Sequence, residues 1–598
     1  MCGFFASSRK LSIPEVDLVY KRLEQRGPDD TRINSSKKGT YIFNRLVCTG
    51  RDISSMQPLN EDILENKNFF LFNGEIYNYL ELNRKFSFNY KKNISDTKVL
   101  SALIKKEGFI NSLKNLNGAY AIAYIEKDFK FSYLSKDTYG QRPLFYSNDK
   151  KNWYLSSDPY SIAYCTNKDL SRDTLLSYLN SNEDFGTRGL FIPGFSFFKD
   201  VYAVRSGETV FLNSSKIKIL KKDYIFPKMI KGSSNINLDI DKFNRAVDRV
   251  TRDYIGNNQD VCFEFSGGID STTLLLSSLK FKNKVKYFTK ISKGIDNIAQ
   301  RSIKKIKKLN VKNTVIKQDK KNYLIDTIKF IRFSASPPRW GTAPAMMPLY
   351  KKMKEEKMKI CISGGGADEF FYGYNNIQKI LNTDFEKLRK MTNINLVKNY
   401  SFSGWINDKI IARLNYKKQI VKLIKIYSKK NPGFRKNHLS ICNFIRFIDL
   451  NIFLPEISSL HSDLVSMESS IELRSVFLDK KITNLATNAL KHDFLLNDSS
   501  FQNNKIFLKK ALSKRCRNLG LDPSEFVEKQ KEGTRNFAIQ AFKDKKLNKL
   551  PKETIRYLKI KKNGVISEKM KFKIFFIAIF HMIFKMKFSN EKIFKIIN

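Results

Sequence analysis

A cysteine directly follows the initiator methionine in the opening sequence MCGFF. The small side chain of Cys2 permits removal of Met1, which would leave Cys2 with a free α-amino group. The thiolate of a cysteine is the nucleophile, and a free cysteine has a pKa of about 8.5. An α-amino group with a pKa of about 7.7–8.0 is partly neutral at physiological pH and can accept the thiol proton. Cys2 could therefore supply both nucleophile and base, or it could be a small residue near a disordered terminus.

Two glycine-rich turns have the residues of a phosphate-binding edge. SGGIDS (266–271) directly follows the apolar run VCFEF, and SGGGADE (363–369) directly follows KICI. Glycines let the backbone approach an anion, and the N-terminus of a following helix favours negative charge. The GxxxxGK[ST] spacing of a Walker loop is missing. Either stretch alone could be only a tight turn, but two such stretches, each with an acid, indicate a nucleotide site.

The acids of the two turns are Asp270 and Asp368. Mg²⁺ prefers one or two carboxylates together with phosphate oxygens. We therefore expect these two side chains to share a Mg²⁺ ion beside a polyphosphate.

The elements that position these residues differ between the two parts of the chain. Aromatic and β-branched runs separated by turn residues predict strands in the first part: FFLF (69–72), AYAIAYI (119–125), FSYL (131–134) and WYLSS (153–157). From about residue 245, apolar runs alternate with helical patterns, which predicts a parallel sheet covered by helices, with both glycine turns at one edge. Beyond about residue 375 we expect mostly helix, and we predict the domain linker in the polar stretch 211–237.

The composition is typical of a large folded protein. With 598 residues, 42% apolar and 13% aromatic, the chain is expected to form two or more domains. Its seven cysteines are odd in number and scattered, which argues against a disulfide framework or a zinc site and favours a reducing, cytoplasmic location. No charged-then-apolar leader precedes Cys2, so we expect no secretory signal.

The charge balance is strongly basic, with 108 Lys and Arg against 58 Asp and Glu and a formal net charge of +50. Three interpretations are open, in order of preference: solvated lysines on helix faces, contact with an anionic membrane surface, and nucleic-acid binding. The apolar run IFFIAIFHMIF (574–584) is too short to span a bilayer. We expect a core or subunit-packing helix there, with an interfacial amphipathic helix as the alternative.

In their order along the chain, these motifs resemble the glutamine-dependent asparagine synthetase family, and the resemblance covers most of the chain. The matching segments of the first half are MCGFF, QRGPDD, NRL, QPL, NGEIYN, SDTKVL, LNGAYA and KDTYGQRPLFY. Those of the second half are SGGIDS, SGGGADEFFYGY, SDLVSMESSIELRSVFLD and QKEG. Each segment is weak alone, but the ordered set is highly specific.

The resemblance implies an α+β N-terminal-nucleophile hydrolase domain, an αββα sandwich, over residues 2–212. It implies an α/β ATP-pyrophosphatase domain with a parallel sheet over 238–540, and a basic helical tail over 541–598. Such an enzyme hydrolyses glutamine, passes ammonia internally, and uses ATP to turn a carboxylate into an amide, releasing AMP and pyrophosphate. ATP and Mg²⁺ are the implied cofactors, and glutamine and a carboxylic acid are the implied substrates. A homodimer and a membrane contact of the tail stay open, and nucleic acid is not expected.

In the first domain the resemblance makes Cys2 the nucleophile. It assigns the oxyanion donors to the Asn73 side chain and the Gly74 backbone N–H, although Asn-Gly by itself could equally be a hairpin turn. Arg45 has the planar fork suited to the carboxylate of glutamine, and Glu75 and Asp96 can receive its α-ammonium. The implied glutamine-binding set is Arg45, Leu46, Val47, Cys48, Thr49, Asn73, Gly74, Glu75 and Asp96.

In the second domain the resemblance implies a set of ATP-binding residues, with Asp270 and Asp368 sharing the metal. The set is Phe265, Ser266, Gly267, Gly268, Asp270, Ser271, Ser363 and Gly364. Lys531 in QKEG matches a family lysine that neutralises charge on the phosphates. Without the resemblance, Lys531 would be one solvated lysine among many.

Three positions depart from the family pattern. Gly365 stands where aspartate-using members carry a glutamate, so a carboxylate that can orient or deprotonate the incoming amine is missing. Asn297 and Lys98 also replace common acids. We expect both half-reactions to survive, with free aspartate and a larger acid such as a sugar uronate as alternative acceptors. A basic RNA-modifying protein that adenylates a nucleobase and a non-catalytic relative with decayed sites are the other functions left open.

Overall fold

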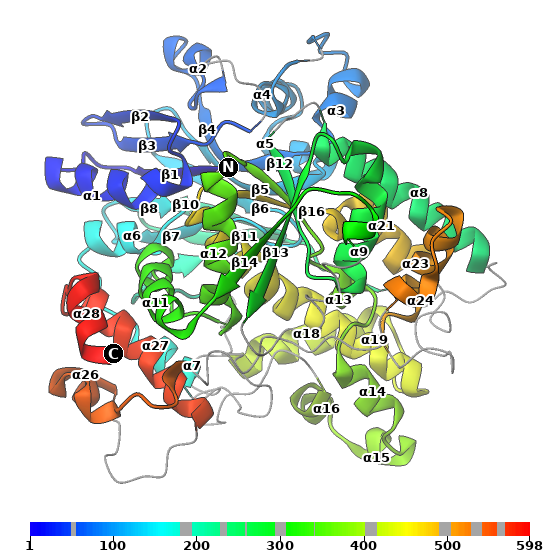
Figure 1. Ribbon diagram of the computed structural model, residues 1–598. Helices are drawn as coiled ribbons and strands as arrows, with labels where there is room; N and C mark the ends of the chain where they lie inside the picture. Colours follow the sequence, from blue (N-terminus) through cyan, green and yellow to red (C-terminus); the bar gives the residue numbers. More distant parts are fainter. Residues whose placement is uncertain are drawn as a thin grey trace.

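The structure is a computed structural model. It describes residues 1–48, 55–91, 93–179, 194–227, 236–256, 260–292, 306–339, 341–400, 416–489, 504–527, 541–558 and 568–598. The chain forms an N-terminal β-sandwich and a following α/β part that lie against each other (Figure 1).

The N-terminal part contains two antiparallel sheets. The first has the order β2 (Asp30–Ser35), β3 (Thr40–Arg45), β1 (Cys2–Ser7), β8 (Trp153–Ser156), β7 (Phe145–Asn148), β9 (Tyr202–Ala203). The second has the order β11 (Ile217–Lys222), β10 (Glu208–Asn213), β6 (Phe131–Lys136), β5 (Gly118–Ile125), β4 (Phe69–Ile76). The four strands predicted from aromatic and β-branched runs are β4, β5, β6 and β8, and all four are confirmed.

Alternation along the strands explains the layering, because successive side chains of a strand point to opposite faces. Phe4 and Leu71 lie in the core between the sheets. Phe5 belongs to the core on the outer side of the first sheet, and Phe72 to that on the outer side of the second. The first outer core includes α1 (Ile13–Leu23), α6 (Pro159–Cys165) and α7 (Arg172–Leu179). The second includes α3 (Tyr79–Lys85), α4 (Asp96–Glu107) and α5 (Phe109–Ser112), while the short α2 (Asn60–Leu64) precedes β4. The arrangement is an αββα sandwich.

The second sheet of the sandwich extends past the predicted end of this part of the chain. β11 pairs with β10 up to Lys222, inside the stretch 211–237 where the sequence predicted a linker. β11 is an edge strand with exposed Ile219 and Leu220 and several lysines. None of its six residues is buried, so no buried face imposes alternation, and charged residues are common on edge strands. Its polar sequence therefore resembled a linker.

A five-stranded sheet organises the second part of the chain. Its order is β14 (Asn313–Gln318), β13 (Lys286–Ser292), β12 (Val261–Glu264), β15 (Ile360–Ser363), β16 (Glu472–Ser475), and all neighbours are parallel. The chain runs outward from β12 to β14 and then returns to add β15 on the other side of β12. The order therefore reverses between β12 and β15, and ligands of open α/β sheets bind in the crevice at such a reversal.

Helices surround this sheet and continue beyond it (Figure 1). Those in contact with the sheet or with its crossovers are α8 (Ile236–Ile255), α9 (Ile269–Ser278), α11 (Lys320–Ser334), α12 (Thr342–Glu355) and α20 (Leu460–Met467). The others before the tail are α13 (Ala367–Phe370), α14 (Asn375–Leu381), α15 (Phe385–Lys390), α16 (Asn393–Tyr400), α18 (Tyr416–Lys430), α19 (His438–Ile448), the π-helical η6 (Asp449–Ser459), α21 (Lys480–Asn484), α23 (Ile506–Asn518) and α24 (Pro523–Phe526). The expectation of mostly helix beyond residue 375 is confirmed, with β16 as an exception.

The last helices pack onto both parts of the molecule. They are α26 (Lys552–Leu558), α27 (Glu568–Phe584) and α28 (Asn590–Ile597), drawn in orange and red in Figure 1 beside α7 and α11. In α27, the ring of Phe580 lies 5.6 Å from that of Phe197, and the ring of Phe584 lies 4.8 Å from that of Tyr160. The apolar run 574–584 is buried throughout, which confirms the prediction of a core helix. Among the described residues, no helix combines the length and apolarity needed to cross a bilayer.

Candidate active sites

Cys2 begins the central strand of the first sheet and faces the core between the two sheets. Its register partner on β3 is Arg45, and its side chain is 8% exposed. The backbone nitrogen of Cys2 donates a hydrogen bond to Asn73 Oδ1 at 3.0 Å. Asn73 lies on β4 of the opposite sheet, so the sandwich itself brings the two predicted residues together.

Asn73 and Gly74 have the geometry of oxyanion donors. Asn73 is fully buried, and its Nδ2 has no hydrogen-bond partner among the described residues. A buried donor without a partner is rare and needs an explanation. Gly74 has a φ of 147°, and a Cβ there would lie 2.0 Å from the Ala119 carbonyl oxygen of β5, so only glycine fits. The Asn-Gly pair is therefore part of a strand and not the hairpin turn that the dipeptide alone allowed.

The predicted glutamine-binding residues lie around the end of β1. Arg45 is buried, and its guanidinium lies 3.4 Å from Asp30 Oδ2. Asp96, at the start of α4, accepts hydrogen bonds from the backbone nitrogens of Ile76 at 3.0 Å and Thr97 at 2.8 Å. Burial raises the pKa of the Asp96 carboxyl to about 6. The carboxylate is thus fixed in place and loses its charge in mildly acidic solution.

The segment after β3 borders the same region. Leu46 donates its backbone N–H to the Met1 carbonyl at 2.9 Å, and Val47 donates to Asp29 Oδ2 at 2.7 Å. Cys48 is buried, with its sulfur 3.7 Å from the Met1 nitrogen. Thr49 lies outside the described residues.

A buried network of charges joins this site to the parallel sheet. The Met1 ammonium lies 3.0 Å from Glu472 Oε2, and Glu472 Oε1 accepts from Arg474 Nε at 2.7 Å. Arg474 Nη2 lies 3.3 Å from Glu75 Oε2. Burial disfavours the Met1 ammonium, but Cys48 and Glu472 outweigh it and raise the pKa of the amine to about 11. Glu75 therefore belongs to both the predicted glutamine site and the contact with β16.

The two glycine turns meet at the reversal point of the parallel sheet. Gly267 and Gly366 have φ values of 76° and 91°, which residues with a Cβ atom rarely adopt. A Cβ on Gly364 would lie 3.0 Å from the Asp270 Cβ, so the two turns touch. Within the first turn the Ser266 and Ser271 hydroxyls lie 3.2 Å apart. Phe265 is buried between the turn and β12, and Gly268 caps α9.

Asp270 and Asp368 also come together, but at a lysine. Lys505 Nζ lies 2.5 Å from an oxygen of each carboxylate. Burial of Lys505 alone would lower its pKa, but the two carboxylates outweigh burial and raise the pKa above its usual value. Two carboxylates that converge on one cation fit the donor set expected for Mg²⁺, although among the described residues no cluster of three or more acids, cysteines or histidines could hold a metal ion. Lys531 and Asn297 lie outside the described residues.

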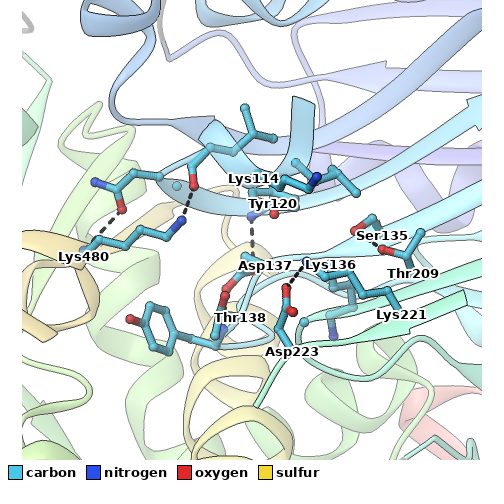
Figure 2. Close-up of a pocket in the computed structure, with 16 residues that line it drawn as sticks. Lys114, Tyr120, Ser135, Lys136, Asp137, Thr138, Thr209, Lys221, Asp223 and Lys480 are labelled. Carbon is cyan, nitrogen blue, oxygen red and sulfur yellow. Dashed lines mark hydrogen bonds and ion pairs between the residues drawn. The ribbon is translucent and has the colours of Figure 1, made fainter. Parts of the chain in front are cut away.

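A separate cavity of about 260 Å³ lies at the contact between the two parts of the chain (Figure 2). Residues of β5, β6, β10 and β11 line it, together with Lys480 of α21. Lys480 Nζ donates to the Leu116 carbonyl at 2.6 Å, and Asp137 accepts from the Tyr120 backbone nitrogen at 3.2 Å (Figure 2). None of the predicted site residues lines this cavity.

Two family models match the chain. A model described as a glutamine amidotransferase domain matches residues 1–225, and one described as asparagine synthase matches residues 241–575, more than half of the chain. The chain belongs to the asparagine synthase family. The predicted resemblance is thereby confirmed.

Curated relatives in this family carry matching names. Asparagine synthetase [glutamine-hydrolyzing] 1 of Bacillus subtilis is 25% identical over 540 residues, which is 81% of each chain. Putative asparagine synthetase [glutamine-hydrolyzing] 2 of Methanocaldococcus jannaschii is 24% identical over 412 residues, 62% of this chain and 76% of the relative. The match to a solved glutamine phosphoribosylpyrophosphate amidotransferase of B. subtilis covers 52% of this chain and 65% of that protein at 16% identity, with a TM-score of 0.27.

Three charged residues of these sites were not singled out from the sequence: Lys505, Glu472 and Arg474. Lys505 precedes α23 in an αL conformation, among many other lysines, and no local pattern marks it. Glu472 and Arg474 lie two residues apart on β16, so they share a face of that strand. This spacing is the signal that could have indicated a pair of charges directed at one partner.

Proposed function

We propose that this protein hydrolyses glutamine at Cys2 and uses the ammonia to convert an AMP-activated carboxylate into an amide, with release of AMP and pyrophosphate. The observation that carries this proposal is the pairing of two sites in one chain. Cys2 faces the Asn73 side chain in the sandwich, and two touching glycine turns with convergent carboxylates lie at the reversal point of the parallel sheet. The names of the curated relatives support the same pair of reactions.

The first half-reaction needs a base, because burial raises the pKa of the Cys2 thiol. Removal of Met1 would create that base as the α-amino group of Cys2 itself. The Cys2 nitrogen already lies 3.0 Å from Asn73 Oδ1, so Asn73 would orient the new amine. Attack of sulfur on the side-chain amide carbon of glutamine forms a tetrahedral oxyanion, which Asn73 Nδ2 and the Gly74 N–H would stabilise. Ammonia leaves, and water hydrolyses the thioester to glutamate.

Glutamine would be held by charges on both of its ends. The Arg45 guanidinium suits the substrate carboxylate, and Asp96 and Glu75 suit its α-ammonium. Backbone groups of Leu46 and Val47, with Thr49, would line the same pocket. Met1 and Cys48 are buried beside Cys2, so removal of Met1 would vacate a side-chain volume next to the nucleophile.

The second half-reaction would use the two glycine turns. Ser266, Gly267, Gly268 and Ser271, with Ser363 and Gly364 of the second turn and Phe265 beside them, would hold ATP by its phosphates. Asp270 and Asp368 would hold Mg²⁺, which supplies neutralising charge to the phosphates. Lys505 would exchange its two carboxylate partners for phosphate oxygens when the nucleotide binds. Lys531 stays a predicted phosphate ligand.

The carboxylic acid that becomes the amide could belong to one of two classes. Names of the curated relatives favour aspartate, whereas Gly365 favours a larger acid such as a sugar uronate by removing a charged side chain. We propose these two as the acceptor classes. The seven cysteines are all free and buried, which supports a reducing, cytoplasmic location.

The test is the variant Cys2→Ala, with Cys165→Ala, a second buried cysteine of the same part of the chain, as control. Cys2→Ala should lose glutamine-dependent amide formation by at least about 10³-fold. It should retain amide and AMP formation when ammonium chloride replaces glutamine, assayed with aspartate and with glucuronate. Intact mass of the active protein should lack Met1. Persistent glutaminase activity in Cys2→Ala, or AMP-free consumption of ATP, would disprove the proposal.

A further inference from the structure

The backbone conformation at Gly365 does not require a glycine. Its φ lies outside the left-handed region, unlike that of its neighbour Gly366. The atoms nearest to a Cβ there would be the Ser475 hydroxyl at 3.2 Å, the Ser363 hydroxyl at 3.6 Å and the Ser475 Cβ at 3.9 Å. Backbone geometry therefore permits a side chain at this position, where a Cβ would lie between two serine hydroxyls and the Ser475 hydroxyl would have to shift by a few tenths of an ångström.

A carboxylate from the neighbouring strand is hydrogen-bonded to one of these two serines. Glu264 is the last residue of β12, the central strand, and lies beside Ser363 of β15. Glu264 Oε1 accepts from the Ser363 hydroxyl at 2.5 Å, and Ser363 Oγ accepts from the Gly365 backbone nitrogen at 3.1 Å. One chain of hydrogen bonds thus joins the Glu264 carboxylate to the backbone of Gly365.

A second hydroxyl group also donates a hydrogen bond to the Glu264 carboxylate. The Tyr350 hydroxyl of α12 donates to Glu264 Oε2 at 3.0 Å. Both carboxylate oxygens therefore receive hydroxyl donors. The neighbouring residues are the buried Cys262 and Phe263 of β12 and the buried Phe265 that follows the strand. Burial of a carboxylate among apolar side chains carries a desolvation cost, which these two hydroxyl donors offset.

We infer that Glu264 is the proton acceptor of the amidation step, supplying from β12 the carboxylate that Gly365 lacks; this inference rests on the proposed function. Ammonia attacks the carbonyl carbon of the acyl adenylate and the C–N bond forms. The C–O bond to AMP breaks, and its electron pair leaves on the AMP phosphate. The surplus proton on nitrogen passes to the Glu264 carboxylate. Ser363 and Tyr350 are positioning residues that aim the carboxylate at the space beside Gly365.

The experiment separates adenylation from amidation. Acceptor-dependent exchange of pyrophosphate into ATP reports adenylation, and amide formation from ammonium chloride reports both steps, each measured with aspartate and with glucuronate. In Glu264→Gln we expect exchange within about twofold of wild type and amide formation reduced by about 10²-fold. Glutaminase activity should not change. The control is Glu356→Gln, which removes a carboxylate bonded to Lys286 at the opposite end of the same sheet and should leave both assays unchanged.

A second variant tests the link to Gly365. Gly365→Glu in the Glu264→Gln background should recover amide formation at least about tenfold, because its carboxylate would enter the same space. Amide formation within about threefold of wild type in Glu264→Gln, or an equal loss of exchange, would overturn the inference. So would a double variant without recovery, which would leave Glu264 a structural role only. Wild-type protein without acceptor-dependent exchange would instead remove the proposed function, and this inference with it.

Discussion

The glutamine site and the nucleotide site of this molecule are built in different ways. Cys2 and Asn73 come from facing strands of one sandwich, and Asn73 is fully buried with a donor left over. At the other site, Asp270 and Asp368 meet at Lys505, which the chain reaches much later. The first site already holds its proposed oxyanion donor in place, whereas the charged groups of the second site pair with one another.

The two sites differ because negative charge appears at different stages of the two reactions. A thiol attack on an amide creates negative charge only briefly, so fixed dipoles such as Asn73 Nδ2 stabilise it best. A nucleoside triphosphate arrives already highly charged and needs counter-charges in advance. Two carboxylates held close together repel each other, and the contacts of Lys505 offset part of that charge.

The largest expected effect comes from cutting the link between the two sites. Arg474→Met would leave Glu472 and Glu75 buried beside each other without their shared cation. Breaking a buried ion pair from one side costs about 3–5 kcal/mol. We expect a clear fall in melting temperature and more glutamate released per amide formed. Arg389→Met, which removes an exposed pair with Glu386, is the control. An unchanged melting temperature would mean that the two parts are not held together by this network.

Asn73→Ala should damage only the first site. Removing one oxyanion donor lowers kcat by about 10²–10³-fold, so glutaminase turnover should fall by that factor. Amide formation from ammonium chloride should stay at the wild-type rate. Asn148→Ala removes an asparagine of β7 that bonds only to backbone carbonyls in the structure and should change neither rate. Equal losses in both assays would contradict the view of Asn73 as a local donor.

Lys505→Met should damage only the second site. It leaves the Asp270 and Asp368 carboxylates facing each other and removes a cation from the proposed phosphate site, so we expect pyrophosphate exchange to fall by about 10²-fold. Glutaminase activity should persist. Lys514→Met, which breaks a pair between Lys514 of α23 and Asp241 of α8, is the matched control. Exchange at the wild-type rate would show that Lys505 only fills space between the acids.

The smallest effect is a pH dependence confined to the first site. The pKa of Asp96 is about 6, so its carboxylate is charged above that pH and neutral below it. The α-ammonium of glutamine stays charged across this range. KM for glutamine should therefore rise as pH falls below 6, by up to about tenfold per unit. Asp96→Asn should raise KM at neutral pH and abolish the trend. A flat profile in wild type would exclude Asp96 from binding the ammonium.

The strands and the glycine turns could be predicted from the sequence because each depends on residues that are close together in the chain. β4 to β6 are marked by aromatic and β-branched runs, and both glycine turns follow buried strands. β11 was mistaken for part of a linker because none of its residues is buried, so it lacks the alternation that a buried face imposes. The partners of Lys505 and Arg474 are set by how distant elements pack together. The sequence has 108 lysines and arginines, and nothing near these two indicates which acid each one contacts. The sequence shows Glu264 as an acid in an apolar strand, but its proposed role depends on the contacts with Ser363 and Tyr350, which only the structure shows.

The burial of Met1 sets an order of events during biosynthesis. Met1 is 2% exposed, and its amine is covered by Glu472, a residue that the ribosome adds long after the sandwich has emerged. No aminopeptidase can reach that amine once β16 has docked. The processing that would free Cys2 must therefore precede the docking of β16, and a polypeptide that completes its tertiary structure first would remain an inactive precursor.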